Sequence, residues 1–298
     1  MSQAQGPLQI AVVIPAYNSA RFLREGLDSV LSQTYPVAEI IVVDDGSKDN
    51  TREVVESYAP PVRYFWQANS GVSPARNGGV QETTSPWVAF LDADDAWEPR
   101  KIERQVKALQ ANPDAVLCYT GKLFIGPDGP GQVCEAIAAD HLWPLLRYQN
   151  PITPSTVLMR RDVFEAAGGF DKRFLGCEDW DLWFRLGSQA KMVALNEPLT
   201  RYRVTPTGLS MNFDKMLSEV GKMISISLIK DLRGWERGSW RRRAWSAELS
   251  RCAISAREVS DPRALPFLLR SLAMWPSPRF LSKRWKSLAV YLFRPRRA

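Results

Sequence analysis

Three acidic residues directly after a short apolar run are the first sign of chemistry in this sequence. Residues 88–91 are typical of a buried strand, and Asp92, Asp94 and Asp95 follow them. Asp92 and Asp94 are two residues apart, and in extended backbone this spacing points both side chains the same way. Two converging carboxylates without a nearby His or Cys suit Mg²⁺ or Mn²⁺. The spacing therefore favours a metal that holds a diphosphate, although a solvated acidic loop leading to a helix cap near Pro99 explains the same residues.

Two earlier apolar runs, 10–14 and 39–43, also end in polar residues. The first is followed by Pro-Ala-Tyr-Asn at 15–18 and the second by Asp-Asp-Gly-Ser at 44–47. Ligands of parallel sheets bind outside the carboxyl ends of the strands, so three such ends together favour a binding site. A turn with a capping serine explains the glycine and the serine of 44–47 but leaves two adjacent acids unexplained. No Gly-x-Gly-x-x-Gly follows the first run, which disfavours a dinucleotide-binding domain.

A second acidic cluster lies far along the chain, at the start of a predicted helix over 178–186. Glu178, Asp179 and Asp181 crowd its first turn. Favourable placement of acids at the positive end of a helix dipole explains one or two of them. A carboxyl group beside a buried aromatic such as Trp180 would have a raised pKa, which suits a general base.

The elements that would position these residues alternate between strand and helix. We expect strands over 10–14, 39–43, 62–66 and 88–91, and helices over 20–33, from a cap at Asn50, over 73–81 and from Pro99. This βαβαβαβ order predicts an α/β fold in which a mainly parallel sheet is flanked by helices. The pattern is less regular after residue 110, with a turn or hairpin at 126–131, a strand at 156–159 and a helix over 162–167.

Length and composition set the broad class of protein. The chain has 298 residues, of which 45% are hydrophobic and 24% charged, as is ordinary for a globular protein of one large domain or two smaller ones. No apolar run reaches the ~18 residues that cross a bilayer, and the first residues lack the pattern of a secretory signal. Four widely spaced cysteines and a single histidine argue against a disulfide framework or a zinc site. We therefore expect a cytoplasmic protein.

The net charge of +7 is unevenly distributed along the chain. Residues 1–214 carry 20 Lys and Arg against 26 Asp and Glu, whereas residues 215–298 carry 19 against 6. We therefore predict a first domain over 1–214 and a basic helical subdomain over 215–298. Apolar residues at helical spacing predict the helices of the second region over 216–232, over 240–258, from Asp261 and over 280–293.

The basic region 215–298 suggests three different roles. Its helices could simply pack on the first domain with solvated Lys and Arg side chains. Basic amphipathic helices that carry Trp and Phe also bind anionic membrane surfaces, which predicts a peripheral protein on the cytoplasmic face of the inner membrane. Trp235, Trp240 and Trp245 lie among arginines and could stack on bases, but no nucleic-acid-binding fold signature is present, so we expect no nucleic acid.

Four segments in this order resemble the family 2 glycosyltransferases. They are Val-Val-Ile-Pro-Ala-Tyr-Asn at 12–18, Val-Asp-Asp-Gly-Ser at 43–47, Leu-Asp-Ala-Asp-Asp at 91–95 and Glu-Asp-Trp-Asp-Leu at 178–182. Gly-Val-Ser at 71–73, Ala-Arg-Asn at 75–77 and Gly-Gly-Phe-Asp at 168–171 add to the resemblance, which covers roughly residues 8–204. It implies a GT-A fold, followed here by a C-terminal helical extension, and an inverting transfer from a nucleotide-diphosphate sugar to a saccharide or lipid-linked saccharide.

The resemblance also implies a role for each matching residue. Asp179 would be the catalytic base, with Glu178, Trp180 and Asp95 on the acceptor side, and Asp94 would hold the Mg²⁺ or Mn²⁺ ion of the Asp-x-Asp motif. The residues of the donor site would be Pro15, Tyr17, Asn18, Asp44, Asp45, Arg76 and Asp92. The product would belong to cell-surface polysaccharide or lipopolysaccharide assembly.

One departure from the family concerns the metal. The family often has a His shortly after Tyr-Arg, but Tyr202 and Arg203 are followed by Val-Thr-Pro-Thr at 204–207, and His141 lies outside the pattern. Water, donor oxygens or the charge of Arg201 or Arg203 would then take the place of that ligand. A protein that binds nucleotide sugars, nucleic acid or membranes without transferase activity is the alternative function.

Overall fold

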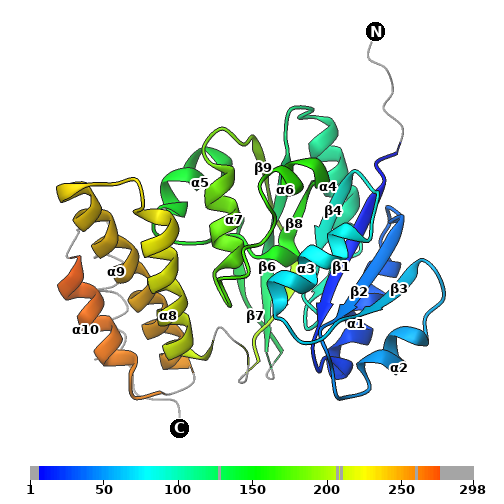
Figure 1. Cartoon of the computed structure of the whole chain (residues 1–298), viewed down its shortest axis with the longest axis horizontal. Coiled ribbons are helices and arrows are strands. Elements are labelled where there is room, and N and C mark those ends of the chain that lie inside the picture. The colour runs from blue at the N-terminus through cyan, green and yellow to red at the C-terminus, as the bar shows by residue number, and fades with distance from the viewer. Residues whose placement is uncertain (1–6, 127–128, 206–207, 209–210, 259–260, 276–298) are drawn as a thin grey trace. The chain divides into compact units, whose positions relative to one another are not determined.

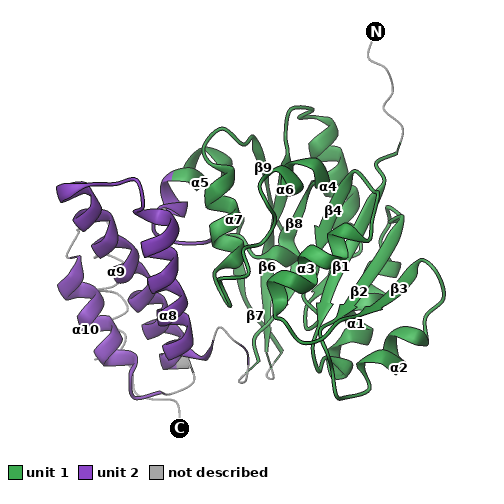
Figure 2. Ribbon diagram, in the orientation of Figure 1, with its two compact units in different colours: residues 1–143, 151–205 green, residues 144–150, 206–298 purple. Residues whose placement is uncertain are grey.

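The computed structural model describes residues 7–126, 129–205, 208, 211–258 and 261–275. The chain forms two compact units, of residues 1–143 with 151–205 and of residues 144–150 with 206–298 (Figure 2). The first unit contains the strands and the second consists of helices. The functional domains predicted over 1–214 and 215–298 stay a prediction.

One sheet organises the first unit (Figure 1). Its strands are β1 (Ile10–Ala16), β2 (Glu39–Asp44), β3 (Val62–Trp66), β4 (Trp87–Phe90), β5 (Ala96–Trp97), β6 (Leu117–Gly126), β7 (Gly129–Cys134), β8 (Val157–Arg160) and β9 (Met192–Arg203). They lie in the order β3-β2-β1-β4-β8-β6-β9-β5, and β7 pairs with β6. The first four strands in this order pair in parallel, as does β6 with β9. The remaining pairs, including β4 with β8, are antiparallel.

Helices pack on the strands of this sheet. The helices of the first unit are α1 (Ala20–Leu31), α2 (Thr51–Glu56), α3 (Val72–Gln81), α4 (Lys101–Gln110), α6 (Arg161–Ala166) and α7 (Glu178–Leu186), with α5 (Ala139–Leu146) running across the division between the units. Val12 and Val42 share a buried cluster with Leu27 of α1 and Val106 of α4. A Cβ on Gly79 of α3 would lie 2.4 Å from Val13, on the alternate face of β1. Burial on both faces explains why these strands read as continuous apolar runs.

The predicted α/β class is confirmed, and the structure adds details that the sequence did not reveal. The expected turn at 126–131 is the connection of the β6–β7 hairpin, in which Gly126 is paired with Gly129. Asn50 precedes α2 but its side chain makes no capping hydrogen bond. The neighbouring Asp49 takes this role, because its Oδ1 accepts a hydrogen bond from the Thr51 backbone N–H at 3.1 Å. The predicted cap was therefore one residue away from the residue that provides it.

The second unit is helical over the described residues. Its elements are α8 (Phe213–Met223), a π-helix over Ile224–Leu228, α9 (Gly234–Glu258) and α10 (Ala264–Met274). Phe213, Leu249, Cys252 and Phe267 meet in a buried cluster of this unit. No described helix is long and apolar enough to cross a membrane. The helix predicted over 280–293 lies outside the described residues.

Candidate active site

The loops after β1 and β2 are tied together by side chains. Asn18 has φ of 49°, a left-handed conformation that Asn tolerates better than most residues. Its backbone N–H donates to Ser47 Oγ at 2.9 Å, and its Oδ1 accepts from the Lys48 backbone N–H at 2.8 Å. Pro15 is buried at the end of β1, whereas Tyr17 is 50% exposed. The Tyr17 ring is thus available to a ligand at this edge of the sheet.

Asp44 and Asp45 are both buried and both accept several hydrogen bonds. The Asp44 carboxylate accepts from the Ser47 backbone N–H at 2.8 Å and from Tyr64 Oη at 2.7 Å. Burial and this hydrogen bond to Asp44 raise the pKa of Tyr64. The Asp45 carboxylate accepts from the backbone N–H groups of Ser70 at 2.9 Å and Gly71 at 2.8 Å. Asp45 therefore fixes the backbone that leads into α3.

Arg76 of α3 forms a buried bridge between two of the predicted site acids. The side chain is 4% exposed. Its Nη1 donates to Glu178 Oε1 at 2.7 Å, and its Nη2 donates to Asp92 Oδ1 at 2.5 Å. Burial alone would lower the pKa of Arg76, but the two carboxylates outweigh burial and raise it. One guanidinium thus joins the acidic segment after β4 to the first turn of α7.

The three acids after β4 have different surroundings. Ser155 connects two of them, because its Oγ accepts from the Asp92 backbone N–H at 3.0 Å and donates to Asp95 Oδ2 at 2.6 Å. The other Asp95 oxygen accepts from the Arg203 backbone N–H at 2.8 Å. Asp95 is fully buried, whereas Asp92 and Asp94 are partly exposed. The accessible carboxylates of this segment are therefore those at the two ends of Asp-x-Asp.

Mutual repulsion and burial change the acidity of this segment. Burial, followed by the negative charge of Asp92, raises the pKa of Asp94 to about 6. The same two effects and the Asp94 carboxylate raise the pKa of Asp95 well above its usual value. A cation that binds beside these carboxyl groups would stabilise their ionised form.

The acids of α7 occupy its first turn, as the sequence predicts. Glu178, Trp180 and Asp181 are buried and Asp179 is partly exposed. Asp181 pairs with Arg185 at 2.6 Å, one turn further along the helix. Asp179 Oδ1 accepts from the Trp180 backbone N–H at 2.7 Å. Of the three acids in this turn, Asp179 presents the accessible carboxylate, whereas Glu178 and Asp181 are buried in ion pairs with arginines.

The charges of both acidic segments affect two partly buried side chains, Tyr202 and Lys122. Burial, and then the charges of Asp95, Asp92, Asp94 and Asp179, raise the pKa of Tyr202. Burial lowers the pKa of Lys122, whereas Asp95 and Asp179 act in the opposite direction. The Lys122 ammonium lies 4.8 Å from the centre of the Tyr202 ring. The acids after β4 and Asp179 of α7 therefore lie close enough to the same two side chains to influence their ionisation.

The residues present suit a divalent metal that takes only two protein ligands. Within the described ranges, no group of three or more His, Cys, Asp or Glu could enclose a metal ion. Mg²⁺ characteristically binds one or two carboxylates and completes its shell with water and substrate phosphates. Asp92 and Asp94 supply oxygen donors of that kind, and the raised pKa of Asp94 reflects negative charge that a cation would offset.

Sequence reasoning missed Ser155 and Lys122. Nothing around Pro154–Thr156, a 3₁₀ turn before β8, indicates that its serine would link Asp92 and Asp95. Lys122 could have been noticed in the sequence, because it is the only charged residue in the otherwise mostly apolar β6. A lone cation in a strand whose first half is buried indicates either a partner in the core or a functional site.

Comparison with known proteins agrees with the architecture of the first unit. Residues 11–168 match the profile of glycosyl transferase family 2. An uncharacterized glycosyltransferase of Nostoc is 44% identical over 231 residues, which are 71% of this chain and 70% of that protein. The chain therefore belongs to glycosyl transferase family 2. Matches to five rickettsial glycosyltransferases, at 33–35% identity, span between 27% and 64% of those proteins.

Solved structures share the fold at low sequence identity. The mannosyltransferase PcManGT of Pyrobaculum calidifontis, solved with GDP-Man and Mn²⁺, has a TM-score of 0.62 at 18% identity, covering 99% of this chain and 85% of that one. Residues 1–349 of S. aureus TarS, solved with UDP, give 0.56 at 16% identity, covering 97% and 93%. The predicted GT-A fold is thereby confirmed.

Proposed function

We propose that this protein transfers a sugar from a nucleotide-diphosphate donor to a hydroxyl acceptor with inversion at the anomeric carbon. The bridge from Asp92 through Arg76 to Glu178 is the observation that carries the proposal. This bridge holds Asp92, which follows β4, beside Glu178 in the first turn of α7. An inverting displacement needs a base near the attacking hydroxyl and, on the opposite side of the sugar, positive charge near the leaving diphosphate, which a cation held by carboxylates would supply.

In this proposal Asp179 is the general base. Its carboxylate takes the proton of the acceptor hydroxyl, while the hydroxyl oxygen forms a bond to the anomeric carbon. The bond between that carbon and the diphosphate oxygen breaks on the opposite face, and the electron pair leaves with the nucleoside diphosphate. Glu178, whose Oε2 has no hydrogen-bond partner among the described residues, and the buried Trp180 shape the acceptor side. Asp95 supports that side through Ser155 and Arg203.

A divalent metal is part of the proposal. Asp92 and Asp94 would hold Mg²⁺ or Mn²⁺, as the Mn²⁺ in the PcManGT structure suggests for this fold. When bound, the metal would neutralise the charge that develops on the leaving diphosphate. Arg76 orients Asp92 at this position, because its guanidinium donates a hydrogen bond to one oxygen of that carboxylate.

The donor would lie over the carboxyl ends of β1 and β2. Pro15, Tyr17 and Asn18 would line the nucleoside pocket, with the exposed Tyr17 ring against the base or ribose. Asp44 and Asp45 would complete that pocket by fixing its loops and presenting acceptor oxygens to the base. TarS and PcManGT were solved with UDP and with GDP-Man, so uridine and guanosine donors are the first to test.

The acceptor side of the proposal follows from the family resemblance. A saccharide or lipid-linked saccharide of a cell-surface polysaccharide or lipopolysaccharide would supply the hydroxyl. Lipid-linked acceptors lie at a membrane, and the excess of Lys and Arg in 215–298 is consistent with work at an anionic surface on the cytoplasmic face.

Nucleotide-dependent thermal stabilisation tests the donor class and the metal together. UDP or GDP with Mn²⁺, at about 100 times its dissociation constant, should raise the unfolding midpoint by roughly 5–10 °C. Asp94→Asn should lose most of this shift, whereas Asp114→Asn, which neutralises an exposed carboxylate, should keep it. A shift that is equal with and without chelator would reject the metal. Stabilisation by an oligonucleotide alone would favour the alternative of a binding protein.

A further inference from the structure

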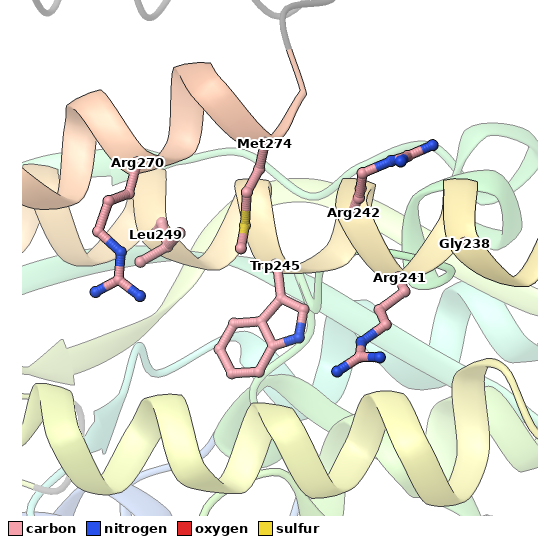
Figure 3. A pocket seen from close by; sticks show the side chains of 7 residues that line it. All are labelled: Gly238, Arg241, Arg242, Trp245, Leu249, Arg270 and Met274. Carbon is pink, nitrogen blue, oxygen red and sulfur yellow. The ribbon is translucent and has the colours of Figure 1, made fainter.

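A hollow of about 480 Å³ lies in the second unit, and none of the residues assigned to catalysis lines it. It is lined by Gly238, Arg241, Arg242, Trp245, Leu249, Arg270 and Met274. Figure 3 shows Arg241 and Arg270 extending on the same side of the ribbon as the Trp245 ring, with Arg242 directed away. The hollow therefore combines an apolar floor from Trp245, Leu249 and Met274 with guanidinium groups at its margins.

The arginines of this hollow differ from others in the same unit. Within the described part of the chain, Arg241, Arg242 and Arg270 form no ion pair with a carboxylate. By contrast, Arg251 pairs with Glu248, and Arg263 pairs with Asp261 at 2.8 Å.

 Because no carboxylate of the described residues forms an ion pair with these arginines, an anion is the ligand that this surface favours.

The residues of α9 that line the hollow belong to a stripe that extends to Trp235. Gly238, Arg241, Trp245 and Leu249 recur at intervals of three and four residues along α9, so they share one face of that helix. Trp235 lies three residues before Gly238 on the same stripe and is 76% exposed. An exposed Trp beside arginines whose aliphatic stems cover apolar surface is the combination found where proteins meet the interface of a bilayer.

We propose that this hollow binds the headgroup of an anionic phospholipid at a membrane surface. Figure 3 shows the Arg241 and Arg270 side chains on opposite sides of the Trp245 ring, so the lipid phosphate would bind beside this ring to one of the two guanidinium groups, each of which can bind phosphate oxygens in pairs. The glycerol and the first methylene groups of the acyl chains would lie against Trp245, Leu249 and Met274. This inference specifies one binding site for the membrane contact proposed above, and it does not depend on the transferase chemistry.

Charge complementarity decides between this occupant and others. Residues 276–298 carry seven Lys and Arg and no acid, so their sequence lacks the negative charge that the arginines of the hollow favour. A nucleic acid offers phosphates, but it has no aliphatic part to match Leu249 and Met274. A phospholipid offers both a phosphate for the arginines and methylene groups for Trp245, Leu249 and Met274.

Vesicle binding by the full-length chain tests the site. Partition onto vesicles of phosphatidylglycerol mixed with phosphatidylcholine is compared for the wild type, Arg241→Gln/Arg270→Gln and Lys230→Gln/Arg233→Gln. The control pair removes the same charge from exposed positions of the same unit that do not line the hollow. One basic residue near an anionic surface is worth about a fivefold change in binding, so the hollow variant should bind about 25-fold more weakly. The control should lose clearly less.

The outcomes separate this site from general electrostatic attraction and from the proposed catalysis. Equal losses in the two variants would overturn the proposal, because they would show that only net charge matters. Binding of an oligonucleotide or of soluble glycerol phosphate in preference to vesicles would also overturn it. Stabilisation by nucleotide with Mn²⁺ should be unchanged in both variants, so failure of the lipid site and failure of the donor site are recorded by different measurements. Arg241→Lys/Arg270→Lys, which keeps the charge but not the paired donors, should bind between the wild type and the Gln variant.

Discussion

Asp179 is the residue on which the proposed chemistry depends. It lies at the start of α7, and its charge reaches the same Lys122 and Tyr202 side chains as the acids that follow β4. Glu178 and Asp181, on either side of it, are committed to Arg76 and Arg185. Asp179 has the partly exposed carboxylate of this turn, and we propose that this carboxylate takes the proton of a bound acceptor.

The Asp179→Asn variant should keep the nucleotide-binding step and lose the transfer step. An amide cannot accept the hydroxyl proton, and general bases contribute roughly 10²- to 10⁴-fold to rate, so kcat should fall by about that factor. The measurement is transfer kinetics beside nucleotide-dependent thermal stabilisation, with Asp114→Asn as the matched control at an exposed site. Near-normal turnover in Asp179→Asn would reject this residue as the base.

Individual residues show how far the sequence could predict the site. The acids at 92–95 and 178–181 were recognisable because several acidic residues follow an apolar strand or open a helix without a structural need for all of them. Ser155 could not be recognised, because its role depends on a turn that a distant part of the chain brings beside Asp92. Asp45 was recognised as unusual, but its bonds to the backbone of Ser70 and Gly71 are visible only in the fold.

At the scale of elements, Arg76 joins α3, the segment after β4 and α7. Removing one partner of a buried ion pair typically costs about 3–5 kcal/mol, because the other charge stays buried and unpaired. Arg76→Met should therefore lower the free energy of unfolding by about that amount, measured by urea denaturation. Arg52→Met provides the control, since the Arg52–Glu56 pair is largely exposed and should contribute less than about 1 kcal/mol. Similar small losses in both variants would argue against Arg76 as a structural bridge.

A second feature at this scale is the buried Lys101 at the start of α4. Its ammonium lies 3.9 Å from the centre of the Trp97 ring and donates to Gln105 Oε1 at 2.9 Å. Burial lowers the pKa of Lys101 to about 7. The corresponding pKa in the unfolded chain is about 10.4, so between these values the unfolded state binds more protons than the folded state. The free energy of unfolding should therefore rise with pH across that window.

Lys101→Met should remove this contribution to the pH dependence. One proton of difference between the states corresponds to a slope of about 1.4 kcal/mol per pH unit, and the variant should show a shallower rise than the wild type between pH 7 and 8.5. Urea denaturation at several pH values measures the slope, and Lys107→Met on the exposed side of the same helix should leave it unchanged. Parallel curves for wild type and Lys101→Met would contradict the lowered pKa.

The elements themselves were predicted to different degrees. Parallel strands β1, β2 and β4 were visible in the sequence because burial on both faces requires continuous apolar runs. The position of β8, antiparallel between β4 and β6, was not visible in the sequence, because pairing between strands distant in the chain leaves no local pattern. The cap of α2 was misplaced by one residue because Asn50 and Asp49 are both good capping residues, and tertiary contacts decide between them.

At the scale of the whole molecule, the two regions of opposite net charge are those to which we assign two different ligands. The acidic region 1–214 contains the residues that we assign to the donor, the metal and the proton transfer. The basic region 215–298 contains the arginine-lined hollow that we assign to a phospholipid. The two assignments are independent, so either can fail without the other. In this proposal the enzyme binds a water-soluble donor with residues of the first region and a membrane surface with residues of the second.

The most direct test is the release of nucleoside diphosphate from a panel of UDP- and GDP-sugars with Mn²⁺, by the wild type, Asp94→Asn and Asp179→Asn. We predict that the wild type turns over at least one donor, that chelation abolishes this turnover, and that each variant loses most of it. Release that continues unchanged in both variants, or the absence of nucleotide binding and turnover with every donor, would contradict the assignment of these two carboxylates to one glycosyl-transfer site.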